Sequence, residues 1–197
     1  MFLLIPAVVI GLILSGCAPR DRYERKLKKG LESGERSDSL FMGIYLGMTS
    51  KQFYAHCWDL NKKGLIKQGA GNKSVEYQVN TELKHPGLMN FYPTFVNDRI
   101  YEMPVSFKYK GWAPWNKELS AENLQKDILR WFEKKYGSGF MKVKHPVHGV
   151  VWVKIDGNRR ITVFRRDELL VWAYFTDMSV PGPKDMIPEN VPNDSIQ

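Results

Sequence analysis

The sequence lacks the short motifs that define most enzymes. It has no glycine-rich phosphate loop, no Gly-x-Ser-x-Gly elbow and no His-Glu-x-x-His pair. Its acidic residues are scattered over turns and strands, with no pairing that would place two carboxylates across one bond. Cysteine is scarce as well, since Cys17 and Cys57 are the only two. These absences favour a protein that is not an enzyme, needs no cofactor and has no disulfide framework.

The apolar stretch that opens the chain, residues 2–14, is too short to span a bilayer. A membrane-spanning helix takes about 20 residues, whereas these thirteen residues match the apolar region of a signal peptide. No Lys or Arg precedes them. The stretch leads into Leu14-Ser15-Gly16-Cys17, which resembles the lipobox of bacterial lipoproteins. Small residues before the cysteine admit the peptidase, and only a thiol at position 17 can carry the lipid thioether.

The lipobox resemblance implies where the protein resides. It implies export, cleavage before Cys17 and acylation of that cysteine with diacylglyceryl and palmitate chains. Each buried CH₂ contributes about 0.8 kcal/mol, so several chains give stable anchoring. Residue 18 is Ala and not Asp, which in the proteobacterial sorting rule implies the outer membrane, with the domain facing the periplasm.

The expected organisation has four parts. Residues 1–16 form the signal peptide, 17–40 the lipidated cysteine with a basic flexible tether, 41–178 a single α+β domain, and 179–197 a proline-rich disordered tail. The net charge of +8 is assigned to the envelope and not to nucleic acid. Six basic residues lie beside the anchor: Arg20, Arg22, Arg25, Lys26, Lys28 and Lys29. They are expected to attract anionic lipid or lipopolysaccharide. The alternative is that they form a merely solvated linker.

Two helices are predicted from periodicity and caps. The first covers about 50–63, where Thr49 and Gln52 form a capping-box pattern and Phe53, Cys57 and Leu60 make an apolar stripe. The second runs from an N-cap at Ser120 to a C-terminal glycine at 137.

Strands are predicted around the second helix on both sides. Residues 75–79 alternate, and 91–96 joins 99–109 through the turn pair Asn97-Asp98. Pro93 and Pro104 indicate an edge strand or a bulge. Further strands are expected at 140–144, 150–155, 159–165 and 169–176. The fold class is therefore α+β, a two-layer domain with two main helices on one face of an antiparallel sheet. The order of elements also allows the domain to consist of two tandem helix-plus-hairpin units.

A second resemblance rests on Gly47-Met48-Thr49-Ser50-Lys51-Gln52-Phe53. This segment is similar to the start of the first helix in small outer-membrane lipoproteins of the SmpA/OmlA (BamE) type and in the related fold of β-lactamase-inhibitor proteins. The resemblance implies a non-enzymatic module that binds a protein partner at the envelope.

The candidate binding surface is the outer face of the C-terminal sheet. If Val151, Val153, Ile155, Ile161 and Val163 face the helices, alternation places an aromatic and cationic set on the other face: Trp152, Lys154, Arg160 and Phe164. Such residue types dominate protein hot spots, although a solvated face is the alternative. Trp112 and Trp115 either offer stacking surfaces to sugars or cover the sheet edge.

Other reactive side chains are interpreted as structural. Cys57 falls on the apolar stripe of its helix, and His56 cannot pair with it because helical neighbours point about 100° apart. His145 and His148 lack a carboxylate or cysteine at a defined spacing, so no metal site is predicted.

The function expected from these features is a non-catalytic binding or scaffolding subunit of a cell-envelope complex. Two alternatives are an inhibitor or recruiter of a soluble periplasmic enzyme, and a binder of lipopolysaccharide or peptidoglycan.

Overall fold

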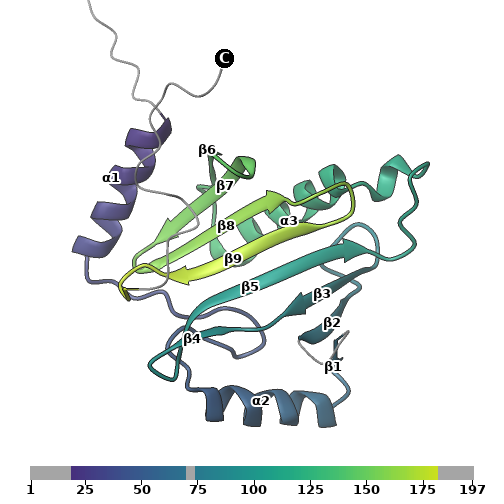
Figure 1. Cartoon of the computed structure of the whole chain (residues 1–197), viewed down its shortest axis with the longest axis horizontal. Coiled ribbons are helices and arrows are strands. Elements are labelled where there is room, and N and C mark those ends of the chain that lie inside the picture. Colours follow the sequence, from purple (N-terminus) through teal and green to yellow (C-terminus); the bar gives the residue numbers. More distant parts are fainter. Residues whose placement is uncertain (1–18, 70–73, 182–197) are drawn as a thin grey trace, which may run out of the picture.

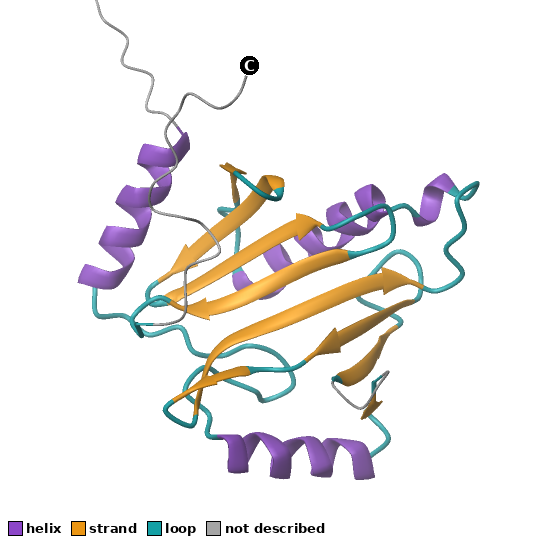
Figure 2. Cartoon of the chain, in the orientation of Figure 1, coloured by secondary structure: helices purple, strands orange, loops and turns teal. Residues whose placement is uncertain are grey.

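A computed structural model describes residues 19–69 and 74–181. The predicted signal peptide and Cys17 lie outside these residues, as does the predicted tail beyond residue 181. Three α-helices are described, α1 (Pro19–Glu32), α2 (Ser50–Lys62) and α3 (Ala121–Tyr136), with a short 3-10 turn η2 (Lys117–Leu119). Figure 2 shows them arranged around one broad sheet.

Both predicted helices are confirmed together with their caps. Thr49 accepts a hydrogen bond from the Gln52 amide while the Gln52 side chain bonds back to the Thr49 amide, which completes the capping box at the start of α2. The Ser120 side chain accepts a hydrogen bond from the Asn123 amide at the start of α3, and Gly137 ends that helix at φ 86°. These caps satisfy amides that the first helical turn leaves without partners.

One antiparallel sheet contains all nine described strands, which confirms the α+β class. Its order is β1-β2-β3-β5-β9-β8-β7-β6, with β4 also paired to β5. The strands are β1 (Ile66–Gln68), β2 (Val75–Val79), β3 (Gly87–Phe91), β4 (Thr94–Val96), β5 (Arg99–Tyr109), β6 (Met141–His145), β7 (Gly149–Asp156), β8 (Arg159–Arg165) and β9 (Val171–Asp177). The strand predicted at 169–176 is confirmed as β9.

A helix followed by an antiparallel meander occurs twice along the chain. The first unit is α2 with β1 to β5, the second is α3 with β6 to β9, and the last strands of the two units, β5 and β9, pair at the centre of the sheet (Figure 1). The similar turns at 97–98 and 157–158 are not equivalent, because one precedes the last strand of its unit and the other does not.

Proline inside the central strand β5 is accommodated by a change of partner. β4 pairs with β5 at positions 99–102, and β3 pairs with it at 105–109. Pro104 lies in the gap between the two. A proline supplies no amide hydrogen to a ladder, so it fits where one partner ends and the next begins.

The sheet face that carries α2 and α3, called the helix face here, is filled by one apolar cluster. Phe53 from α2 and Leu124, Ile128 and Phe132 from α3 belong to it, together with Met103, Val105, Phe107, Ala173 and Phe175 from the two central strands. Their side chains are essentially inaccessible to solvent. Both main helices thus lie on one face, as the sequence predicts.

The prediction of a flexible tether at 17–40 is wrong for its described part. Residues 19–32 form α1, which packs on the opposite sheet face, called the α1 face here. Tyr23 is only 6 % exposed and belongs to a second apolar cluster with Val143, Val151 and Phe164. Tyr23, Leu27 and Gly30 are spaced by four and three residues and so share one side of the helix.

Gly30 marks the closest approach of α1 to the sheet. A Cβ atom at this position would lie 2.7 Å from the Gly157 carbonyl oxygen and 3.1 Å from Ile155 Cγ2. Polar composition concealed this helix, because its contact stripe is a tyrosine, a leucine and a glycine among basic residues.

The segment after α1 is held in place as well. Arg36 forms ion pairs with Asp38 and with Asp177, the second at 2.9 Å. The Asn158 side chain donates to Asp38 and accepts from the Ser37 amide. These contacts join residues 36–38 to the ends of β8 and β9, so the folded unit begins with α1 and not at residue 41.

Candidate binding surface

The predicted candidate residues do not share one face of the sheet. Residues directly opposite each other in neighbouring strands point to the same face. Trp152 lies opposite Val163, and Lys154 lies opposite Ile161. The two-residue turn Gly157-Asn158 sets this register by placing Asp156 opposite Arg159. Val151 and Val153 therefore face away from Ile161 and Val163, which contradicts the predicted arrangement.

Trp152 and Lys154 belong to the helix face. Trp152 packs against the main apolar cluster, and the Lys142 ammonium lies 5.0 Å from its ring centroid. Lys154 is 7 % exposed and forms an ion pair with Asp156. Lys154 is buried, and Trp152 is half-buried at the β6 and β7 edge.

Arg160 and Phe164 lie on the α1 face and are buried. Arg160 is fully inaccessible, and its guanidinium donates to the Tyr23 hydroxyl at 3.1 Å. Phe164 is 2 % exposed. A buried guanidinium needs hydrogen-bond partners to offset its lost hydration, so Arg160 is a structural contact of α1 and not a surface residue for a ligand.

A series of nearly parallel rings crosses the α1 face, named the ring ladder here. The centroid distances are 4.7 Å from His145 to His148, 4.1 Å from His148 to Phe164, 5.9 Å from Phe164 to Tyr174 and 5.7 Å from Tyr174 to Trp172. No interplanar angle in the series exceeds 24°. Rings from β6, β8, β9 and the β6–β7 turn are thereby stacked into one strip.

His145 anchors the turn at one end of the ring ladder. Its Nδ1 accepts hydrogen bonds from the amides of Val147 and His148, both at 3.1 Å. Burial, with the nearby His148 and Arg160, lowers the pKa of His145 to about 4. Burial also lowers the pKa of His148. The neutral ring is required because a protonated Nδ1 cannot accept these bonds.

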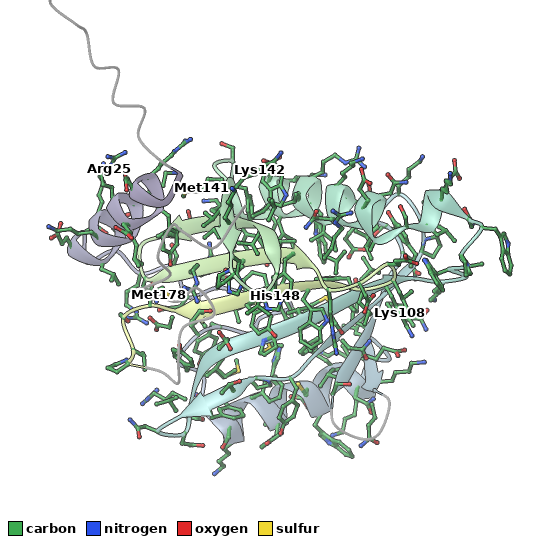
Figure 3. The ribbon with its side chains drawn as sticks, turned by 45° about the horizontal axis from the view of Figure 1, so that its top comes forward. Arg25, Lys108, Met141, Lys142, His148 and Met178 are labelled. Carbon is green, nitrogen blue, oxygen red and sulfur yellow. The ribbon has the colours of Figure 1, made fainter. Side chains whose placement is uncertain are left out.

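The other end of the ring ladder is cationic and lies beyond α1. The Arg166 guanidinium is 5.4 Å from the Trp172 ring centroid, within the range of a cation–π contact. Trp172 lies opposite Ser106 of β5, and Lys108 follows two residues later on the same face. Figure 3 shows His148 between Arg25 on α1 and Lys108 at the far end of β5. Trp172, Tyr174 and Lys108 are half-buried, so their outer edges remain accessible.

The two tryptophans between β5 and α3 differ in exposure. Trp112 is half-buried, whereas Trp115 is 85 % exposed. Of the two, Trp115 presents the more accessible ring. The prediction left sheet covering and sugar stacking open for both tryptophans. The greater exposure of Trp115 makes it the better candidate for stacking.

The basic residues predicted beside the anchor are distributed around α1. Arg22, Arg25, Lys28 and Lys29 are exposed and Lys26 is half-buried, while the side chain of Arg20 is outside the described set. Lys28 makes one ion pair, with Glu32 at 3.8 Å. The acidic residues Asp21 and Glu24 lie among them.

Groups with chemical reactivity are held in inert settings. Cys57 is half-buried in α2, and burial raises the pKa of its thiol to about 11, which suppresses the reactive thiolate. Within residues 19–69 and 74–181, no three His, Cys, Asp or Glu side chains are placed to hold a metal ion. A surface hollow of about 410 Å³ lies beside β1 and β2. Its charged residues, Lys67 and Glu76, are ion-paired at 3.0 Å.

The α1 face thus presents stacked rings and a guanidinium. Flat rings with a terminal guanidinium can stack against planar or apolar groups and attract anionic ones. The prediction overlooked Trp172 and Tyr174. The alternation of Val171, Ala173 and Phe175 was the signal that identifies them, since it leaves Trp172 and Tyr174 on the other face.

Comparison with protein-family models, with curated proteins and with solved structures finds no match to this chain. Among the helices of the described part, none has both the length and the apolar character needed to cross a bilayer.

Proposed function

We propose that this protein is a lipid-anchored lipoprotein of the bacterial envelope that acts as a non-catalytic binding subunit, with the domain in the periplasm and the anchor most consistent with the outer membrane. The observation that carries the binding role is the ring ladder, and its accessible end at Trp172 and Tyr174 is the contact site. The partner is a protein of an envelope complex, because aromatic rings beside an arginine are the composition of protein hot spots.

The anchoring half of the proposal depends on Cys17 and is tested on the expressed protein. Mass spectrometry of the mature N-terminal peptide is expected to show acyl chains on Cys17 and loss of residues 1–16. An intact N-terminus with a free thiol would refute the anchor.

The binding half is tested by cross-linked pull-down from detergent-solubilised envelopes. Wild type is compared with Trp172→Ala and Tyr174→Leu, and Trp58→Ala serves as the matched control because that indole is 62 % exposed on α2, away from the ring ladder. A near-stoichiometric membrane-protein partner should be lost in the first two variants and kept in the third. Retention in all three would remove the ring ladder as the contact site. A soluble partner would favour an inhibitor or recruiter of a periplasmic enzyme.

A second candidate, a cell-wall glycan or lipopolysaccharide binder, is favoured by the exposure of Trp115. Aromatic faces stack on sugars, and clustered cations suit phosphorylated glycolipid. Retention on peptidoglycan or lipopolysaccharide resin that Trp115→Ala and added salt both abolish would support this role.

A further inference from the structure

The start of α1 and the β6–β7 turn lie at the same end of the molecule. Gly30 lies against the turn after β7, and Tyr23 belongs to the same apolar cluster as Val151 and Val153 of that strand. Figure 1 shows α1 and β7 running in the same direction, with the start of each at the same end of the molecule.

The β6–β7 turn exposes aliphatic side chains at this end. Val147 is 78 % exposed and Val150 is 53 % exposed. Hydrogen bonds from the amides of Val147 and His148 to the His145 ring restrict the conformation of this turn. Lys144, opposite Val150 in the ladder, is exposed beside them. The turn is thus a small apolar tip with a basic flank.

The length of chain before α1 limits how far this tip can be from a lipid anchor. Cys17 precedes the first residue of α1 by two positions, and two extended residues reach about 7 Å. A flexible tether through residue 40 would instead have allowed roughly 80 Å. Because α1 is packed on the sheet, the start of α1, from which any lipid on Cys17 would extend, and the β6–β7 turn belong to the same end of the folded unit.

The charges around this end are mixed with an excess of basic groups. The first two turns of α1 carry the basic residues Arg20, Arg22 and Arg25 against the acids Asp21 and Glu24. Lys144, opposite Val150 beside the turn, adds to the basic side. An apolar tip with surrounding cations is complementary to a bilayer that carries anionic head groups.

We propose that the β6–β7 turn and the first turns of α1 dock onto the anionic phospholipid surface that holds the lipid anchor, with Val147 and Val150 entering the head-group layer. This inference rests on the proposed lipidation of Cys17. It sets the orientation of the domain, since the opposite edge of the sheet, at β1 and α2, then points away from the membrane.

The test uses the full chain, expressed so that Cys17 is acylated, with Cys57→Ser as background. An environment-sensitive fluorophore is attached at Val147→Cys, and at Leu65→Cys as the matched control, because Leu65 is a 51 % exposed aliphatic residue beside β1 at the other edge of the sheet. The proteins are reconstituted in vesicles of phosphatidylglycerol and phosphatidylethanolamine, or of phosphatidylcholine alone. Flotation reports the anchor, and quenching by lipids brominated near the head group reports docking.

Docking predicts quenching at position 147 and none at position 65, in the anionic vesicles only. Arg22→Gln and Lys144→Gln should each lower the ratio of docked to undocked protein about fivefold, the effect of one basic residue near an anionic surface. Val150→Asp should abolish quenching at an unchanged melting temperature. Flotation with no quenching at position 147, or with equal quenching at both positions, would overturn the docking and leave the anchor. Failure to float would overturn the anchor and the docking together.

Discussion

The two faces of the sheet are filled by different kinds of contact. On the helix face, Phe107, Phe132 and Phe175 form edge-to-face and tilted ring contacts inside a continuous apolar cluster. On the α1 face, the buried groups include Arg160 and Thr162, and the rings stack nearly parallel. The first face encloses its side chains beneath α2 and α3, whereas α1 contacts the β6 and β7 side of the second.

This difference indicates that the two faces contribute unequally to the free energy of folding. Burial of apolar side chains is the dominant favourable contribution to folding, and the helix face supplies most of it. A face that holds a guanidinium and half-exposed rings contributes less, because buried polar groups must first recover their lost hydration. The α1 face can therefore vary its outer contacts without loss of the fold.

The largest expected effect is on the helix face. Phe132→Ala removes a ring that contacts Phe107 and Phe175 in a fully enclosed site, so the free energy of unfolding should fall by about 3–5 kcal/mol. Urea denaturation followed by circular dichroism measures it. Tyr54→Ala, which truncates a 51 % exposed ring of α2, is the control and should change stability little. Equal losses in both variants would contradict the assignment of the core to this face.

A smaller and more local effect is expected where α1 meets the sheet. Tyr23→Ala removes a buried ring and leaves the Arg160 guanidinium without the Tyr23 hydroxyl, at a cost of about 2–3 kcal/mol. Hydrogen exchange should show the amides of α1 opening faster, with α3 unaffected. Tyr23→Phe isolates the hydroxyl and should cost less. Fast exchange of α1 already in the wild type would mean that the helix is not docked.

Acid should weaken the α1 face before the helix face. His145 has a folded pKa of about 4, below the ordinary value near 6.5, so the unfolded chain takes up the proton first as the pH falls. The free energy of unfolding should therefore fall by roughly 1–3 kcal/mol as the pH is lowered from about 6.5 to about 4. Unfolding titrations of wild type and His145→Gln, compared over this window, measure the difference. Parallel curves would show that His145 does not contribute.

The smallest effect is expected at the cap of α2. Thr49→Ala removes the side-chain oxygen that accepts from the Gln52 amide, which costs about 1 kcal/mol. Thr49→Ser keeps that oxygen and should restore most of the loss. The melting temperatures of the two variants provide the measurement. A loss as large as that of Phe132→Ala would mean that the cap, and not the core, controls the helix face.

Local signals explain why much of the fold could be predicted. The caps at Thr49 and Ser120 act within one helical turn, and the strand that became β8 was predicted with its observed bounds. The pairing of β7 with β8 is also local, because the two-residue turn Gly157-Asn158 connects these strands directly. The error in assigning Trp152 and Lys154 to the ligand face was therefore avoidable, because that turn alone sets which β7 and β8 side chains share a face.

The ring ladder was less accessible to prediction. It brings together His148, Phe164 and Trp172, which are distant enough in sequence that no periodicity links them. Their stacking requires the pairing of β8 with β9 and the return of the β6–β7 turn over the sheet. The buried state of Arg160 likewise depends on Tyr23, 137 residues earlier in the chain.

The sequence by itself determined the α+β class, the two main helices with their caps, most strand positions and the absence of a catalytic motif, since each depends on residue types a few positions apart. Only the tertiary structure decided that residues 19–32 are a packed helix and which rings meet on the α1 face. Those outcomes depend on surfaces that come into contact after the sheet has formed, and the free energy of burying Tyr23 against β6 to β8 exists only in that arrangement.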